Sequence, residues 1–162
     1  MKYTIKKSGK KGMGVFASKN IKKNSEIMNF DLTKNKVYNY KELRKVPKKD
    51  INHLDPIGNG KYVVDYSPFS YINHSCNPNS YIKEKNHKKG KVIALKSIKK
   101  NEEISLDYTI TANITEHWKE KCFCNSNNCR KFIDSEYRSL PKELQIKYFK
   151  LLPLWKKRLL ST

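Results

Sequence analysis

The four cysteines constrain what this chain can fold into more than any other feature of its sequence. Three of them lie close together in the pattern Cys122-x-Cys124-x4-Cys129, and the fourth, Cys76, lies far upstream. Cys76 belongs to the stretch Tyr71-Ile72-Asn73-His74-Ser75-Cys76-Asn77-Pro78-Asn79-Ser80. This stretch is too polar for a core strand, and its Asn and Ser side chains can hold an irregular turn by bonding to nearby backbone. A link between Cys76 and the downstream cysteines would fix the shape of everything between them.

The chemistry of these cysteines depends on the redox compartment. The chain opens with a lysine-rich stretch, residues 1–7, that has no apolar run behind it, which predicts no secretory signal. No window approaches a membrane span either. We therefore expect an intracellular protein, in a bacterial cytoplasm or a eukaryotic nucleus or cytoplasm, whose thiols stay reduced. Cysteines at these spacings then indicate metal ligands rather than disulfides, and the alternative is free buried thiols. His117 is a possible substitute ligand.

The charge of the chain is extreme for its size. Lysine and arginine number 35 against 15 acidic residues, so the net charge is 35 − 15 = +20 on 162 residues, a length that suits one domain. Such a charge favours polyanions such as nucleic acid. We expect non-specific nucleic-acid binding and no membrane partner. The alternative is compositional, because the lysines are spread along the chain rather than gathered in a tail.

The apolar pattern predicts many short strands. Residues 3–30 indicate strands around a glycine-rich bend, and residues 31–60 indicate an insert lying on a β framework, broken by prolines. A short strand at 62–65 leads to the polar stretch. Beyond it, two apolar runs flank the turn at 86–90 and predict a hairpin, and residues 98–108 indicate a turn followed by a strand.

The spacing becomes helical from Ser135 onward, and Pro153 bends or ends the run. The helical positions are Leu140, Leu144, Tyr148, Leu151 and Leu152. Together these patterns predict a β-rich domain with helical additions.

Four separated motifs follow one another along the chain. They are Gly12-Met13-Gly14-Val15-Phe16-Ala17, Asn73-His74-Ser75-Cys76-Asn77-Pro78-Asn79, Glu102-Glu103-Ile104-Ser105-Leu106-Asp107-Tyr108 and Cys122-x-Cys124-x4-Cys129-Arg130. In this order they resemble the SET-domain lysine methyltransferases with a post-SET zinc motif. The departures from that pattern are Ser70-Tyr71 before Ile-Asn-His, Leu106 in a position that is commonly aromatic, and Asn125 in place of a glycine. The Leu106 change leaves the number of transferred methyl groups open.

The resemblance implies a fold and a division of the chain. The implied fold is mainly β (α+β), a SET-domain β-clip of short strands in which the second and third motifs form a pseudoknot. A post-SET zinc segment and a C-terminal helix follow. The expected division is a SET catalytic domain at 1–110 with a variable insert at 31–61, a post-SET segment at 111–133 and a helical extension at 134–162.

The reaction implied by the resemblance is transfer of a methyl group from S-adenosylmethionine to the ε-amine of a protein lysine. The amine must be neutral to attack, yet its ordinary pKa is about 10.4. Desolvation in a narrow aromatic channel and the nearby sulfonium would lower it. Tyr108 is the expected catalytic hydroxyl. Tyr71 and Tyr62 are candidate channel walls, with plain packing as their alternative role.

The resemblance also assigns binding residues. The expected cofactor site combines Lys11, Gly12, Met13 and Gly14 with Asn73, His74, Tyr108 and Phe123, where Met13 and its glycines would approach the methionine part and Phe123 would cover the adenine ring. The expected metal is one structural zinc on Cys76, Cys122, Cys124 and Cys129, a closed thiolate site with no position for a water.

Two kinds of function remain open from the sequence. The first is an enzyme that methylates a protein with an accessible lysine, such as a histone or another DNA-associated basic protein. The second is a catalytically inactive, zinc-stapled basic module that binds nucleic acid. Because a basic enzyme repels a basic substrate at long range, the first needs either a bridging polyanion or a locally acidic cleft, for which Glu102, Glu103 and Asp107 lie near the expected site in sequence.

Overall fold

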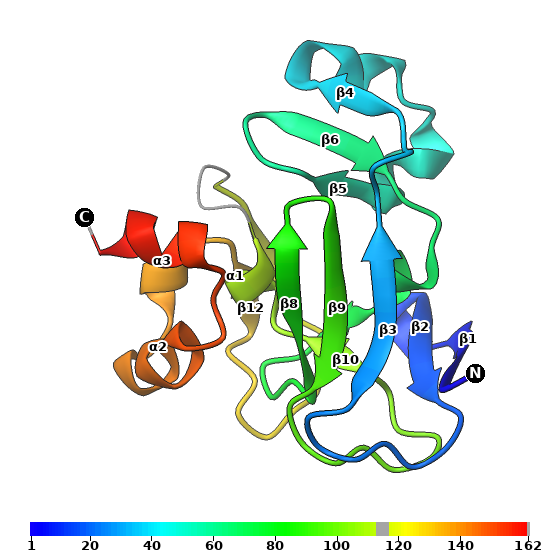
Figure 1. The fold of residues 1–162 in the computed structure, drawn as a ribbon, viewed down its shortest axis with the longest axis vertical. Coiled ribbons are helices and arrows are strands. Elements are labelled where there is room, and N and C mark those ends of the chain that lie inside the picture. Colours follow the sequence, from blue (N-terminus) through cyan, green and yellow to red (C-terminus); the bar gives the residue numbers. More distant parts are fainter. Residues whose placement is uncertain (113–116, 162) are drawn as a thin grey trace.

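The computed structural model describes residues 1–112 and 117–161, and it confirms the mainly β fold class (Figure 1). The strands are β1 (Tyr3–Lys7), β2 (Met13–Ala17), β3 (Glu26–Asp31), β4 (Val37–Asn39), β5 (Leu54–Pro56), β6 (Lys61–Val64), β7 (Asn73–His74), β8 (Ser80–Asn86), β9 (Lys89–Ala94), β10 (Ser105–Leu106), β11 (Lys119–Lys121) and β12 (Phe132–Asp134). The α-helices are α1 (Tyr108–Thr111), α2 (Lys142–Phe149) and α3 (Leu154–Leu160). Short 3-10 turns are η1 (Gly9–Lys11), η2 (Tyr40–Lys45), η3 (Lys48–His53), η4 (Pro68–Tyr71) and η5 (Tyr137–Ser139).

The centre of the molecule is the antiparallel sheet β3-β9-β8 (Figure 1). The hairpin predicted around residues 86–90 is confirmed, since β8 and β9 pair from Ser80↔Ala94 to Asn86↔Lys89. One face of this sheet carries Val92 and Ala94, whose side chains are fully buried. They pack in the main core with Ile104 and with residues of β2. Burial of these apolar side chains is what holds the short strands together.

Residues 31–61, predicted as an insert, contribute β4 and β5 to a second small sheet, ordered β4-β6-β5, at one end of the central sheet (Figure 1). The middle strand, β6, is the short strand that the sequence predicted at 62–65 and placed after the insert. The helical piece of the insert begins with a capping box, in which the Asn39 side chain accepts from the N–H of Glu42 and the Glu42 carboxylate accepts in return. Val63 on β6 is fully buried and packs with Phe30, so this second sheet is joined to the central sheet by an apolar contact.

The second and third motifs lie side by side, as the sequence predicted. Strands β7 and β10 pair in parallel, Asn73 with Ser105 and His74 with Leu106. The buried Asn79 side chain locks this arrangement, because it accepts from the N–H of Ser105 at 2.9 Å and donates to the carbonyl of Glu103 at 2.8 Å. A polar side chain that replaces missing strand hydrogen bonds explains why this stretch is rich in asparagine.

The predicted C-terminal helical run forms two helices, α2 and α3, separated at Pro153 (Figure 1). Lys156 on α3 is fully buried, and its ammonium donates to the carbonyls of Ile110 and Ala112, both at 2.7 Å. These carbonyls end helix α1 and would otherwise lack partners. The C-terminal segment therefore holds the helix that begins with Tyr108. No helix in the described part of the chain is long and apolar enough to cross a membrane.

Candidate active site and cysteine cluster

A cavity of about 540 Å³ lies between the insert sheet, the central sheet and β11. Its walls are mostly apolar and aromatic, and they include Phe30, Tyr62, Phe69, Leu106, Tyr108 and Trp118. Of the three tyrosines predicted for the reaction, Tyr62 and Tyr108 line this cavity. Tyr71 instead packs against the main core and edge-on to His53, 5.1 Å between ring centroids. Leu106 and Trp118 also line the cavity. Trp118 could not be predicted from the sequence, because no spacing rule connects it to Tyr108.

Tyr108 is held from both ends. Its hydroxyl donates to the carbonyl of Ile72 at 2.8 Å, and its backbone N–H donates to Nδ1 of His74 at 3.1 Å. Burial raises the pKa of Tyr108 well above its usual range, and the negative charges of Asp55, Glu103 and Glu120 add to this effect. The hydroxyl therefore stays protonated at neutral pH. It is a fixed, uncharged polar group at the wall of an apolar cavity.

A second group of predicted site residues meets around Glu103. Its carboxylate forms an ion pair with Lys11 and accepts from the Ser8 hydroxyl at 2.6 Å and from Nδ2 of Asn73 at 2.8 Å. Burial tends to raise the pKa of Glu103, but these three donors outweigh it and lower the pKa. Glu103 thus joins Ser8 and Lys11, just before the first motif, to Asn73 of the second motif, a role that its place in the sequence did not indicate.

The glycines of the first motif leave room for close approach. A Cβ on Gly14 would lie 2.6 Å from a Glu103 oxygen and 2.8 Å from Nδ2 of Asn73, so only glycine fits beside this pair. At Gly12, by contrast, φ is +79° and nothing lies within 4 Å of an added Cβ. With Met13 42% exposed between them, a ligand can reach this backbone directly.

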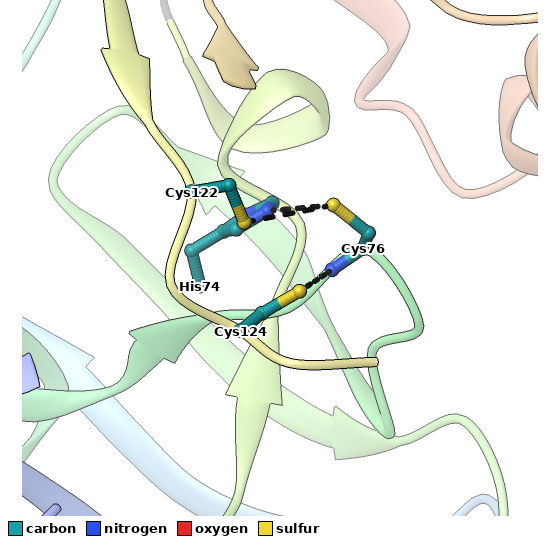
Figure 2. Close-up of side chains that lie close together, drawn as sticks. All are labelled: His74, Cys76, Cys122 and Cys124. Atoms are coloured by element: carbon teal, nitrogen blue, oxygen red, sulfur yellow. Dashed lines mark hydrogen bonds between the residues drawn. The ribbon is translucent and has the colours of Figure 1, made fainter. Parts of the chain in front are cut away.

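The four cysteines are all unpaired by disulfides, and three of them gather with His74 (Figure 2). The ligand atoms of His74, Cys76, Cys122 and Cys124 lie within 4.8 Å of one another. Two sulfurs, each about 2.3 Å from a tetrahedral zinc, stand about 3.8 Å apart. The Cys76 and Cys122 sulfurs are 3.8 Å apart, so their spacing fits zinc. Cys129 packs against the same cluster.

The ring of His74 is arranged as a donor to this cluster. Burial lowers the pKa of His74 to about 4, so the ring is neutral, and the 3.7 Å separation from Asp107 is not an ion pair. Because Nδ1 accepts from Tyr108, the single ring proton belongs on Nε2, which lies 3.3 Å from the Cys76 sulfur. A protonated nitrogen cannot bind a metal. In this protonation state His74 donates to the Cys76 sulfur and is not itself a metal ligand. Cys129, which packs against the same cluster, stays the fourth ligand predicted from the sequence.

Arg130 connects the cysteine cluster to the start of α1. Its backbone N–H donates to the Cys76 sulfur at 3.3 Å, and its guanidinium binds the buried carboxylate of Asp107 through two hydrogen bonds of 2.7 and 2.8 Å. This bidentate pair fixes the residue before Tyr108. Asp107 and Glu103 are thus neutralised by Arg130 and Lys11, and they do not make the cavity acidic as the sequence suggested.

The Phe123 side chain is 45% exposed, with the Lys121 ammonium 5.7 Å from its ring centroid. A ring in this position is free to stack on a ligand, and its role at the cofactor stays a prediction. His117, the substitute ligand considered from the sequence, is exposed. The predicted segment 111–133 includes residues 113–116, which lie outside the described residues.

One acidic group of the cavity is Asp55 on β5. It pairs with the fully buried Val63, so it faces inward. Its Oδ2 atom is buried and has no hydrogen-bond partner among the described residues, although the residue keeps some exposed surface. Burial, and after it the charge of Asp65, raise the pKa of Asp55 from 3.8 to about 7.

Asp55→Asn should therefore stabilise the protein in a pH-dependent way. Below the unfolded-state pKa of 3.8 the proton is bound in both states and the folded protein bears no penalty. As pH rises to about 7, the unfolded carboxyl ionises while the folded one does not, so wild-type stability falls and the penalty then persists. We expect the melting temperature of the variant to exceed that of wild type by more at pH 8 than at pH 5.

The matched control is Asp31→Asn on β3. Asp31 is exposed, and its pKa is lowered by the Thr33 hydroxyl and by Lys89, 2.9 Å away. Its replacement should not stabilise the protein at either pH. A melting temperature of Asp55→Asn equal to or below that of wild type at pH 8 would contradict the burial argument.

Comparison with known proteins gives a consistent result. The family model described as SET domain matches residues 12–109. The chain is 30% identical over 132 residues to human Histone-lysine N-methyltransferase 2D. The aligned region covers 76% of this chain and 2% of that protein. It is 29% identical over 141 residues to the Saccharomyces cerevisiae Histone-lysine N-methyltransferase, H3 lysine-36 specific, covering 80% of this chain and 19% of that one. The chain thus spans a small part of these relatives.

Solved structures show the same fold. The methyltransferase domain of human Histone-lysine N-methyltransferase SETMAR aligns with a TM-score of 0.61 at 20% identity, over 81% of this chain and 57% of that one. Arabidopsis thaliana SUVH6, solved in complex with SAM, aligns with a TM-score of 0.60 at 21% identity, over 81% and 33%.

Proposed function

Because this chain belongs to the SET-domain family, whose model covers residues 12–109, we propose that it is an S-adenosylmethionine-dependent protein-lysine N-methyltransferase. The observation that carries the proposal is the placement of Tyr108. Its hydroxyl lies at the wall of an apolar cavity, while its backbone is tied to His74 of the motif expected to hold the cofactor.

Each part of the site has a separate task in this proposal. S-adenosylmethionine supplies a methyl group on a positively charged sulfur. The apolar walls exclude water from the substrate lysine, and desolvation favours its neutral amine. The Tyr108 oxygen, whose proton is donated to the Ile72 carbonyl, has lone pairs free to accept an N–H of the amine. Fixed polar groups of this kind align the nitrogen for in-line attack.

The cofactor would lie against Gly12 and Met13 and contact Asn73. Asn73 is positioned for this because its Nδ2 donates to both the Met13 carbonyl and Glu103. Lys11 would contribute by fixing Glu103, rather than by touching the ligand. Phe123 would cover the adenine ring from the cysteine segment.

The zinc would be structural and bound by Cys76, Cys122, Cys124 and Cys129. Burial resists ionisation of the Cys124 thiol, but the N–H of Cys76 and the hydroxyl and N–H of Ser126 outweigh it and lower its pKa to about 6. A thiolate prepared in this way fits a metal ligand. The metal would join the segment 111–133 to the SET unit at 1–110, and the helices in 134–162 would complete the molecule.

The test of this function is direct. The protein is incubated with isotopically labelled S-adenosylmethionine and candidate substrates, including histones and other DNA-associated basic proteins. Mass spectrometry then reads the modified residue and the number of methyl groups. Label on lysine side chains supports the proposal, and no transfer to any protein despite cofactor binding contradicts it.

The second candidate function is a nucleic-acid-binding module without catalysis, which the net charge of +20 favours. A module that had lost catalysis would not need to keep Asn73 bonded to Glu103 and His74 bonded to the backbone of Tyr108. Calorimetric titration with S-adenosylmethionine separates the two functions, because only the enzyme needs to bind it.

The charge yields a prediction of its own. We expect non-specific DNA binding that weakens steeply with salt, since each phosphate that the protein neutralises releases about 0.9 of a counterion. At low salt, methylation of a DNA-bound basic protein should exceed that of the same protein free. The measurement is a salt titration of DNA affinity alongside turnover with and without DNA. An affinity that does not change between low and moderate salt would show that the lysines are only solvated surface.

A further inference from the structure

The residue types that line the cavity beside Tyr108 differ from the composition of the whole chain. The chain carries 35 lysines and arginines, yet none of the described residues that line the cavity is a lysine or an arginine. Three carboxylates line it instead, Asp55 from β5, Glu84 from β8 and Glu120 from β11. They come from three separate strands, so only the folded chain brings these acidic side chains to one cavity. Such a cavity concentrates field lines that attract cations.

Asp55 is more deeply buried than Glu120. Glu120 is exposed at the rim, whereas the Oδ2 atom of Asp55 is buried and has no hydrogen-bond donor among the described residues. Asp55 is close enough to Tyr108 for its charge to act on the tyrosine hydroxyl. A buried carboxylate without a partner destabilises the free protein. A cation delivered by a ligand would remove this penalty.

We infer that Asp55, in a cavity that Glu84 and Glu120 also line, forms a subsite for a second basic side chain of the substrate, one that flanks the lysine to be methylated. The inference rests on the proposed function. The cavity of about 540 Å³ falls within the range of about 300 to 1,000 Å³ that holds drug-sized ligands, so it has room for more than one extended side chain. Arginine fits best, because its guanidinium binds a carboxylate through two parallel hydrogen bonds and keeps its charge when desolvated.

The same arrangement resolves the repulsion between a basic enzyme and a basic substrate. Long-range repulsion from the surface lysines is screened within about 8 Å at physiological salt, whereas a desolvated pair inside the cavity is screened much less. A substrate with a flanking arginine is then held by the cavity even though the molecular surface repels it. Selectivity would come from the buried pair and not from the net charge.

The test uses peptides with a single lysine. Arginine is placed in turn at each of the three positions on either side of the lysine, and each peptide is paired with one that carries citrulline, a neutral isostere, at the same position. Affinity is measured by fluorescence anisotropy with the whole chain, with and without S-adenosylhomocysteine, so that no turnover is needed. We expect wild type to bind one arginine peptide about tenfold or more tighter than its citrulline partner, as a hydrogen-bonded charge pair implies.

Asp55→Asn should bring that ratio close to one. The matched control, Asp31→Asn, removes an equivalent charge from β3 outside the cavity and should leave the ratio as in wild type. Equal affinity of wild type for both peptides at every position would overturn the inference. So would an Asp55→Asn variant that binds both peptides more weakly but keeps their ratio, because Asp55 would then serve the target lysine itself.

The result is separable from the proposed function. If the binding ratio behaves as expected but no peptide is methylated with labelled cofactor, the subsite stands and the enzymatic function fails. If lysines are methylated at equal rates with flanking arginine or citrulline, the enzymatic function stands and the subsite fails.

Discussion

Replacing Tyr108 with phenylalanine should lower methyl transfer about 100-fold or more, since loss of one orienting polar group at a reacting centre raises the barrier by a few kcal/mol. Affinity for S-adenosylmethionine should stay within a few fold, because the backbone N–H of residue 108, which bonds His74, is retained. The measurements are single-turnover transfer of labelled methyl groups and calorimetric titration of the cofactor.

The control for this variant is Tyr66→Phe. Tyr66 is 54% exposed, and its hydroxyl bonds Asp50 outside the cavity. The lost hydrogen bond from Tyr108 to the Ile72 carbonyl should lower stability by only about 0.5 to 1.5 kcal/mol, so both variants should fold. Turnover of Tyr108→Phe near that of wild type would show that Tyr108 is not the catalytic tyrosine.

The second large effect is expected on the cysteine cluster. The purified protein should contain about one zinc per chain, and Cys124→Ser should lose most of it, because serine does not replace a thiolate ligand. Cys129→Ser should lose zinc as well, since the His74 ring proton lies on Nε2 and the histidine cannot substitute. Elemental analysis measures the metal.

Loss of zinc should damage one part of the molecule and not all of it. Metal binding is coupled to the folding of the segment that carries the ligands. Strands β11 and β12 should lose protection from hydrogen exchange, and cofactor affinity should fall with them, while the central sheet β3-β9-β8 keeps its protection through its own apolar core. Adding zinc back to chelated wild type should reverse both changes. A folded, active preparation without metal would disprove the role of the cluster.

The identity of the reacting groups was predictable from the sequence because it depends on residue type and local spacing. Cysteines spaced as Cys-x-Cys-x4-Cys, with a fourth thiol inside Asn-His-Ser-Cys, have few chemical uses, and the structure brings these two segments together. The hairpin of β8 and β9 was predictable for a similar reason, since alternation and turn residues act over a few positions.

The charge of the site, in contrast, was decided only by the tertiary structure. Glu103 and Asp107 belong to the same motif as Tyr108, yet Lys11 and Arg130, which are remote in the chain, neutralise them. Asp55 belongs to an insert with no motif, and only the pairing of β5 with β6 turns its carboxylate inward toward the cavity. The sequence by itself therefore predicted which groups could react and bind metal. Folding determined which charges remain unpaired, because pairing depends on distances between segments that no local spacing encodes.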